Sequence, residues 1–522
     1  MTTSPRSTPR PSSRTPAANG AHGPAETPAA TDWEYAPAPE SLKVAIAPRY
    51  GHFIGGAFVD PAPARARSGA PAYFATINPA TERTLSEIAD GSPEDVDSAV
   101  RAARAALPRW AGLDPRNRAK YLFRLARRIQ DRARELAVLE TLDGGKPIKE
   151  SRDVDVPLVA QHFFYHAGWA DKLPYAFPGR APRPVGVCGQ IIPWNFPLLM
   201  AAWKLAPALA CGNTCVLKPA ETTSLSALRL AEILHEIDLP PGVVNIVTGA
   251  GATGAALVEH PGVDKVAFTG STEVGKRIAK AIAGTPKRLT LELGGKSPNI
   301  IFEDASLDQA VEGIIQGIYF NQGHVCCAGS RLFVQEGIAA EVAAKLRIRL
   351  ASLRVGDPMD KNTDLGAINS RAQLERISRY LAIGRDEGAT LHVADRPGAC
   401  TPADATSGFG RGFFCRPSFF TGVQPSHAIS REEIFGPVLA VLTFRTPEEA
   451  ILRANNSSYG LAAGVWTDKG SKILEIAKRL EAGVVWLNTY NRFDPASPFG
   501  GYKESGFGRE GGLQGLRAYV TL

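Results

Sequence analysis

The feature that most constrains the fold is a regular alternation of short apolar runs and amphipathic segments in the middle of the chain. Strands are predicted at residues 186–192, 214–217, 243–247, 265–269 and 286–293. Helices are predicted between them at residues 198–211, 225–236, 252–259 and 273–283. Such alternation across short loops is typical of a mostly parallel, doubly wound α/β sheet. Ligands of these sheets lie beyond the carboxyl ends of the strands, so we expect the functional site there.

The N-terminal segment, residues 1–41, has the composition of a disordered tail. Its first 40 residues hold eight of the chain's 40 prolines and almost no aliphatic residues that could form a core. The alternative is an organelle transit peptide, because Arg6, Arg10 and Arg14 precede any acidic residue. The prolines disfavour the amphipathic helix that such a signal needs.

Turn residues and helical periodicity predict further elements on both sides of the central sheet. Before it we expect a strand and turn at residues 50–56, a hairpin at 76–89 and helices from residue 93 and over 117–141. After it, Ser306 is predicted to begin a helix, with Gln309 at the capping-box spacing.

A second α/β run is predicted from residue 331 to about 488. Its expected helices are residues 338–353, 371–387 and 447–455, and residues 396–412 are expected to form a surface loop. Residues 513–522 are too short and apolar to stand alone. We expect them to pack against another surface, for which a second subunit is one candidate.

Composition excludes several classes of protein. The chain is 44% apolar and 21% charged, as in ordinary soluble globular proteins, and its charge of +7 is modest for 522 residues. This charge, spread without long basic runs, argues against a nucleic-acid partner. The most apolar window, residues 191–211, is interrupted by Pro193, Pro197 and Lys204, so no membrane span is predicted. No secretory signal is visible, and a cytoplasmic location is expected.

Seven cysteines at irregular spacing fit neither a disulfide framework nor a zinc site, and no metal is predicted. One of them, Cys326, lies in a glycine-flanked turn after a predicted helix. We consider Cys326 a candidate thiol nucleophile for covalent chemistry on a carbonyl carbon. The alternatives are that Cys326 is a buried inert thiol and that the adjacent Cys327 is the nucleophile.

Two further polar side chains fit chemistry on a carbonyl carbon. Glu292, at a strand end between leucines and before two glycines, suits a base in a dry place, or else a salt-bridge partner. Asn195 lies between two aromatic residues and suits an oxyanion donor, or else a cap for the helix that begins at Pro197.

Three strand-to-helix turns are candidate dinucleotide contacts. Gly249, Gly251 and Gly254 match the G-x-G-x-x-G pattern, but at the third strand of the run and without the expected acid about 20 residues later; a plain tight turn is the alternative. Residues 268–275 suit a phosphate at a helix N-terminus, or a structural cap by Ser271. Within residues 218–221, a Lys and a Glu could form hydrogen bonds with the hydroxyl groups of a ribose. The alternative is that they form a solvated charge pair in a loop.

Seven blocks along the chain carry a family resemblance. They are residues 193–197 (Pro-Trp-Asn-Phe-Pro), 218–221 (Lys-Pro-Ala-Glu), 268–275, 291–296 (Leu-Glu-Leu-Gly-Gly-Lys), 320–330, 432–437 and 497–503. From about residue 42 to the C-terminus the sequence resembles the NAD(P)-dependent aldehyde dehydrogenase superfamily. The resemblance implies that Cys326 attacks the aldehyde, that Asn195 and the Cys326 N–H hold the oxyanion, and that a hydride passes to the nicotinamide. It implies further that Glu292 activates water to hydrolyse the thioester and that Glu510 relays protons.

The same resemblance implies sets of binding residues. The cofactor contacts are Ile192, Trp194, Lys218, Glu221, Gly251, Gly254, Phe268, Gly270, Ser271, Thr272, Glu273, Val274, Gly275, Glu433 and Phe435. The aromatic residues expected to wall the aldehyde tunnel, or else to be ordinary core, are Phe196, Trp203, Phe493 and Phe499. Glu221 favours NAD, with NADP as the alternative, because a carboxylate repels a 2′-phosphate. His324 departs from the pattern, since many members have Gln at this position.

The resemblance also implies a domain plan and a homo-oligomer. We expect a cofactor-binding domain at residues 42–166 and 185–292 and a catalytic domain at 293–496. Residues 167–184, as a hairpin, and 497–522 are expected to join subunits of a homodimer or homotetramer. The alternative functions are an NADP-preferring or semialdehyde-specific member, an enzyme that passes the acyl group to coenzyme A, a cofactor-independent cysteine esterase, and a catalytically inactive homologue.

Overall fold

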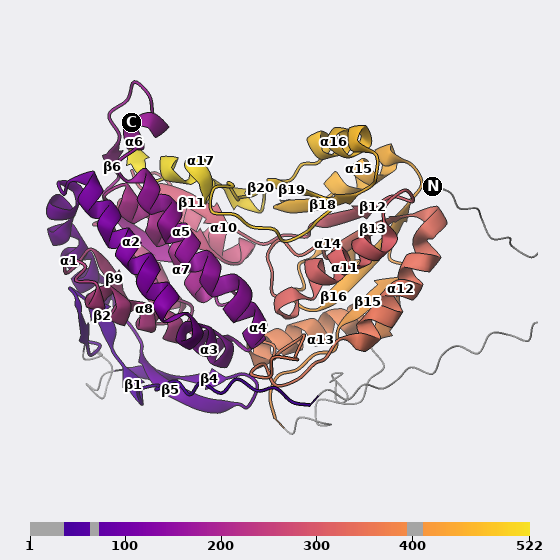
Figure 1. The fold of residues 1–522 in the computed structure, drawn as a ribbon, viewed down its shortest axis with the longest axis horizontal. Helices are drawn as coiled ribbons and strands as arrows, with labels where there is room; N and C mark the ends of the chain where they lie inside the picture. The colour runs from indigo at the N-terminus through magenta and orange to yellow at the C-terminus, as the bar shows by residue number, and fades with distance from the viewer. Residues whose placement is uncertain (1–35, 63–71, 394–410) are drawn as a thin grey trace, which may run out of the picture. The chain divides into compact units, whose positions relative to one another are not determined.

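Two sheets of mostly parallel strands organise the molecule, one in each half of the chain (Figure 1). The computed structural model describes residues 36–62, 72–393 and 411–522. Residues 37–522 form one compact unit. Most of the predicted tail (1–41) and most of the predicted loop (396–412) lie outside the described residues.

The first sheet contains the predicted strand–helix alternation. Its parallel strands are β7 (Val187–Ile191), β8 (Thr214–Lys218), β9 (Val244–Ile246), β10 (Lys265–Thr269) and β11 (Arg288–Glu292). The antiparallel strands β2 (His52–Ile54), β3 (Ala57–Val59) and β21 (Gly506–Phe507) complete the order β21-β11-β10-β7-β8-β9-β2-β3. The strand order reverses at β7, which places a crevice at the carboxyl ends of β7 and β10.

The helices predicted between these strands form within one or two residues of their expected bounds. They are α7 (Pro197–Ala210), α8 (Leu225–Glu236), α9 (Gly251–Glu259) and α10 (Thr272–Ala281). The hairpin of β4 (Tyr73–Asn78) and β5 (Arg83–Ala89) and helix α1 (Pro93–Ala111) also form as predicted. Helices α2 (Pro115–Asp131) and α5 (Val156–Trp169) pack beside α7 (Figure 1).

Two local predictions are wrong. The helix expected over residues 117–141 is two helices, α2 (Pro115–Asp131) and α3 (Ala133–Gly144), separated at Arg132. No proline or glycine marks this break, where the Arg132 side chain pairs with Glu232 and Glu236 of α8. The capping box expected at Ser306 does not form: Ser306 precedes α11 (Leu307–Ile318) without a side-chain hydrogen bond.

The second sheet has the order β14-β15-β16-β13-β12-β18-β19. Its parallel strands are β12 (Pro298–Ile301), β13 (Arg331–Gln335), β15 (Ser418–Thr421), β16 (Val438–Phe444), β18 (Ala462–Trp466) and β19 (Val484–Leu487), with β14 (Thr390–Val393) antiparallel. The predicted helices are α12 (Ala339–Ser352), α13 (Arg371–Asp386) and α15 (Pro447–Asn455).

The hairpin expected within residues 167–184 is also wrong. This segment contains the end of α5, the short helix α6 (Leu173–Ala176) and strand β6 (Arg183–Pro184), which pairs with the C-terminal strand β22 (Val520–Thr521) instead of with a local partner. The chain end therefore packs on its own subunit, with Tyr519 and Val520 buried. Within the described ranges, no helix is long and apolar enough to span a membrane.

Candidate active site

A cavity of about 230 Å³ gathers side chains from both halves of the chain. The turns after β7, β10 and β11 open onto it from the first sheet, and residues 325–327 face it from the loop after α11. Further lining comes from residues 154–158, from α7 and α13, from Phe320, Glu433 and Phe435, and from the last thirty residues. Cys326, Glu292, Asn195 and Glu510 all line this one cavity, although more than 300 residues separate the first and last of them in sequence.

The two adjacent cysteines differ in exposure. Cys327 is 1% exposed, and its thiol donates to Asn491 Oδ1 at 3.6 Å. Burial raises the pKa of Cys327 well above its ordinary value. Cys326 is half-buried at the cavity surface. A thiol must be reachable and ionisable to act as a nucleophile, so this geometry favours Cys326.

Glycine fixes the loop that carries these thiols. Gly323 has φ +74°, and a Cβ there would lie 2.2 Å from the carbonyl oxygen of Gly436. A Cβ at Gly295 would lie 2.5 Å from the carbonyl oxygen of Cys326. The backbone therefore makes close contacts that only glycine permits, and they bring the thiol loop against the turn after Glu292.

Glu292 ends β11 as a nearly dry carboxyl group. Its side chain is 4% exposed, and among the described residues neither carboxylate oxygen has a hydrogen-bond partner. Burial, with a further contribution from Glu510, raises the pKa of Glu292 well above 4.5. A carboxyl group with a raised pKa beside open space has the properties of a general base.

Asn195 does not cap α7, whose N-cap is Phe196 without a side-chain bond. Its side-chain N–H instead donates to the carbonyl oxygen of His324 at 2.8 Å, and its own backbone carbonyl accepts from Asn321 Nδ2 at 2.8 Å. A primary amide has two N–H groups, so the second remains for a ligand in the cavity.

Lys204 is a buried cation that sequence reasoning passed over as a site residue. Its ammonium pairs with Glu510 and donates to Thr269 Oγ1 at 2.6 Å. The available signal was a single lysine in α7, a helix otherwise made of apolar residues and prolines. A lysine inside such a helix needs a buried partner, because an unpaired charge there is costly.

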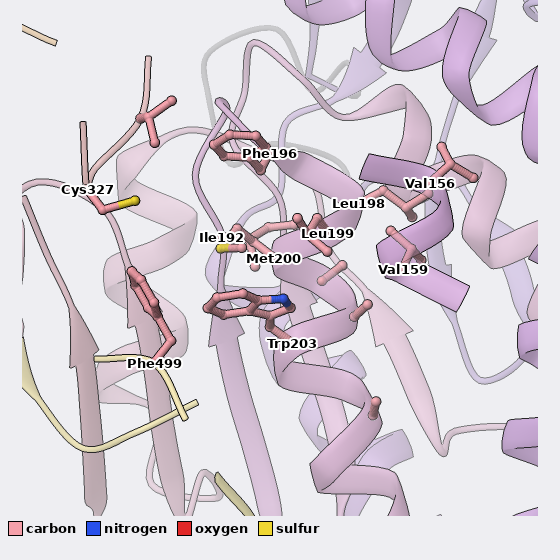
Figure 2. Close-up of a cluster of buried hydrophobic side chains, with 14 of the residues drawn as sticks. Val156, Val159, Ile192, Phe196, Leu198, Leu199, Met200, Trp203, Cys327 and Phe499 are labelled. Atoms are coloured by element: carbon pink, nitrogen blue, oxygen red, sulfur yellow. The ribbon is translucent and has the colours of Figure 1, made fainter. Parts of the chain in front are cut away.

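The four predicted tunnel residues form an aromatic wall, defined as Phe196, Trp203, Phe493 and Phe499. All four line the cavity. Trp203 contacts Phe499 and Phe493 with ring centroids 5.3 and 6.4 Å apart, and Phe196 stacks on Phe320 at 6.1 Å. Figure 2 shows Phe196 and Trp203 reaching toward the side of Phe499 and Cys327.

The predicted cofactor residues divide into two groups. Those that line the cavity are Trp194, Gly270, Ser271, Glu433 and Phe435. Those outside it lie at the ends of β7, β8, β9 and β10 or in the turns and first helical turns that follow, and they are Ile192, Lys218, Glu221, Gly251, Gly254, Phe268, Thr272, Glu273, Val274 and Gly275. The Ser271 hydroxyl accepts from the Val274 N–H at 3.3 Å, so the predicted cap exists. The Lys218 ammonium lies 3.5 Å from Glu221.

Comparisons with known proteins identify the family of the chain. The aldehyde dehydrogenase family model matches residues 66–522. This chain belongs to the aldehyde dehydrogenase family. It is 50% identical over 463 residues to the human mitochondrial aldehyde dehydrogenase, covering 86% of this chain and 87% of the relative. It is 47% identical over 463 residues to human retinal dehydrogenase 2, with the same two coverages. A structure of an aldehyde dehydrogenase from Bacillus cereus in complex with NAD⁺ superposes with a TM-score of 0.84 at 44% identity, covering 91% of this chain and 95% of that one.

Two further cavity residues of this aldehyde dehydrogenase were missed from the sequence. Gln373 and Arg376 line the cavity from α13. Gln373 Nε2 donates to the Phe435 carbonyl at 2.8 Å, and Arg376 donates to the Glu433 carbonyl at 2.6 Å. Nothing local in the sequence marks them, because their partners lie about 60 residues later. Within the part of the chain that the structure describes, no cluster of three or more His, Cys, Asp or Glu side chains is placed to hold a metal ion.

Proposed function

We propose that the chain oxidises an aldehyde to a carboxylate, with NAD as hydride acceptor, through a covalent intermediate on Cys326. The observation that carries the proposal is the meeting of Cys326, Glu292 and Asn195 in one cavity with an aromatic wall. A thiol, a base and an amide are the parts that acyl transfer through a thioester requires.

The strand ends of the first sheet fit a dinucleotide. The backbone N–H groups at the start of α10 suit a phosphate. The turn before them requires a glycine at position 270, where a Cβ would lie 2.4 Å from the Phe268 ring. Lys218 and Glu221 are proposed to hold the adenine-side ribose, and the Glu433 carboxylate to accept from the other ribose. The relative from Bacillus cereus was solved with NAD⁺. When bound, NAD accepts a hydride from the carbon attached to sulfur.

The chain's own residues would then act in order. The Cys326 thiolate attacks the carbonyl carbon, and the Asn195 side chain with the Cys326 N–H stabilises the oxyanion. Loss of the hydride leaves a thioester on Cys326. Glu292 takes a proton from water, whose oxygen attacks the thioester, and the carboxylate leaves as the thiol is restored. The buried Lys204–Glu510 pair lies beside Glu292 and is proposed to pass that proton on.

The aromatic wall favours apolar aliphatic or aromatic aldehydes over strongly charged ones. A panel of aldehydes assayed at 340 nm with NAD and, separately, with NADP tests the activity, its substrate class and its cofactor. We expect NADH formation to be fastest with apolar aldehydes. Absence of reduced cofactor with every aldehyde and either cofactor would overturn the proposal.

Self-association and location remain predictions. A homodimer or homotetramer is proposed, and Tyr175, which is 82% exposed in the segment 167–184, supports a contact surface there. Light scattering coupled to size-exclusion chromatography would measure the mass, and a monomer would contradict the proposal. A cytoplasmic location is proposed from the sequence and can be tested by cell fractionation.

A further inference from the structure

His324 is part of a closed set of three rings beside the cavity. Its imidazole stacks on Phe435 with ring centroids 5.9 Å apart and an interplanar angle of 13°. The edge-to-face contacts of Trp194 join it to His324 at 4.8 Å and to Phe435 at 5.3 Å. Trp194 and Phe435 line the cavity, whereas His324 lies behind them, 1% exposed.

The backbone around these rings leaves little freedom. Phe435 has φ +60°, a left-handed conformation that is rare for a bulky residue and costs free energy. Its carbonyl is held by Gln373, and the Gly323–Gly436 approach described above presses the two loops together. The strained Phe435 therefore depends on surrounding contacts for its position, and one of them is the His324 ring.

His324 also contacts Asn195 through its backbone. Its carbonyl oxygen accepts from the Asn195 amide at 2.8 Å. Substitutions of the side chain leave this carbonyl in place, so the function of the ring can be separated from that of the backbone.

One of the two imidazole nitrogens has no polar contact within the part of the chain that the structure describes. Among the described residues Nε2 is buried without a hydrogen-bond partner. Burial, with a smaller effect of the Lys146 ammonium, lowers the pKa of His324 to about 3. The ring is therefore neutral at physiological pH, and its contribution comes from packing, not from proton transfer.

We propose that His324 is a positioning residue whose ring fixes Trp194 and Phe435 as a rigid wall against the nicotinamide end of bound NAD. This inference rests on the proposed function, because it assigns the partner of that wall. It predicts that loss of the ring weakens NAD binding and leaves the chemical steps intact once NAD is saturating.

The test compares four variants of the full-length chain by calorimetric titration with NAD⁺ and by steady-state kinetics. His324→Gln keeps polarity without a ring, His324→Leu keeps bulk without a ring, and His324→Phe keeps a ring without nitrogen. His166→Gln is the matched control, because His166 is also a buried imidazole, but its ring contacts are with His162 and Tyr165, which do not line the cavity.

We expect the dissociation constant and the KM for NAD to rise roughly three- to ten-fold in the Gln and Leu variants, because each variant loses the aromatic contacts of the His324 ring. The kcat at saturating NAD should stay near the native value, His324→Phe should restore native binding, and His166→Gln should not change it. Circular dichroism checks the fold of each variant, and the Leu variant carries the comparison if a buried amide destabilises the Gln variant.

Two results would overturn the inference. Native NAD affinity in both ringless variants would show that the ring does not position the wall. A loss in His324→Phe as large as that in His324→Gln would assign the role to the imidazole nitrogen. If the native chain bound no NAD⁺ at all, the proposed function itself would fail, which is a distinguishable outcome.

Discussion

The two walls of the cavity differ in the kind of group that they present. On the aromatic wall, Trp203 contacts Phe493, Phe499 and His162 through its ring, and its neutral Nε1 is the polar atom that is buried without a partner among the described residues. The acidic wall is defined as Glu292 and Glu510, and the Lys204 ammonium, which does not line the cavity, pairs with Glu510. There, both oxygens of Glu292 and one of Glu510 are buried without a partner among the described residues.

This difference suggests that the two walls have different functions, one in the reaction and the other in binding the aldehyde. An unpaired buried polar group costs about 1–3 kcal/mol, and a charged one costs more. A folded chain tolerates that cost where a carboxylate must stay free to take a proton. We therefore expect changes on the acidic wall and at the thiol to alter rates, and changes on the aromatic wall to alter affinity for the aldehyde.

The largest effect is expected at the thiol. Cys326→Ala removes the nucleophile, so NADH production at 340 nm should fall by roughly a thousand-fold or more. Cys327→Ala, the matched control, should retain most of the activity. Substantial turnover in the first variant and none in the second would transfer the nucleophilic role to Cys327.

Glu292→Gln on the acidic wall should be next in size. Loss of a general base slows steady-state turnover by roughly a hundred-fold or more. The first turnover should still release NADH, because hydride transfer precedes hydrolysis of the thioester. Stopped-flow absorbance would record this as a burst, and a variant that binds NAD but gives no burst would contradict the assignment.

The pH profile sharpens the same assignment. The base form of Glu292 is the deprotonated one, and its pKa is raised well above 4.5 by burial. The kcat should therefore rise with pH, with its acid limb well above the pH expected for an exposed glutamate. The Glu292→Gln variant should lose that limb, and an unchanged profile in the variant would place the titrating group elsewhere.

On the aromatic wall, the substitution Trp203→Ala should mainly weaken the affinity for the aldehyde. We expect the KM for an aromatic aldehyde to rise about ten-fold, because contacts of this size distinguish apolar substrates to that extent. The burst amplitude at saturating aldehyde should be retained. A fall in kcat with an unchanged KM would break the division between the two walls.

The smallest effect is expected at Glu221, whose side chain is 52% exposed. Glu221→Gln removes the charge that repels a 2′-phosphate, so the preference for NAD over NADP should fall roughly five-fold. Initial rates with each cofactor measure the ratio. Glu259→Gln, at an exposed glutamate that ends α9 and is not among the predicted cofactor contacts, is the charge-matched control.

Much of the fold could be predicted because its signals are local. Apolar runs and helical periodicity placed α8 and β10 at their observed bounds. The break at Arg132 and the pairing of β6 with β22 depend on partners about 100 and 340 residues away, which no local pattern reports. The aldehyde dehydrogenase motifs supplied the candidate residues, and the structure adds Lys204, Gln373 and the ring contacts of His324.

The most direct test of the account is to trap the acyl group. Glu292→Gln, mixed with NAD⁺ and an aromatic aldehyde and quenched in acid, should carry one acyl group, which peptide fragmentation by mass spectrometry should locate on the sulfur of Cys326. The Glu292→Gln, Cys326→Ala double variant should carry none. NADH release without any acylated peptide, or acylation of Cys327 instead, would contradict the central claim.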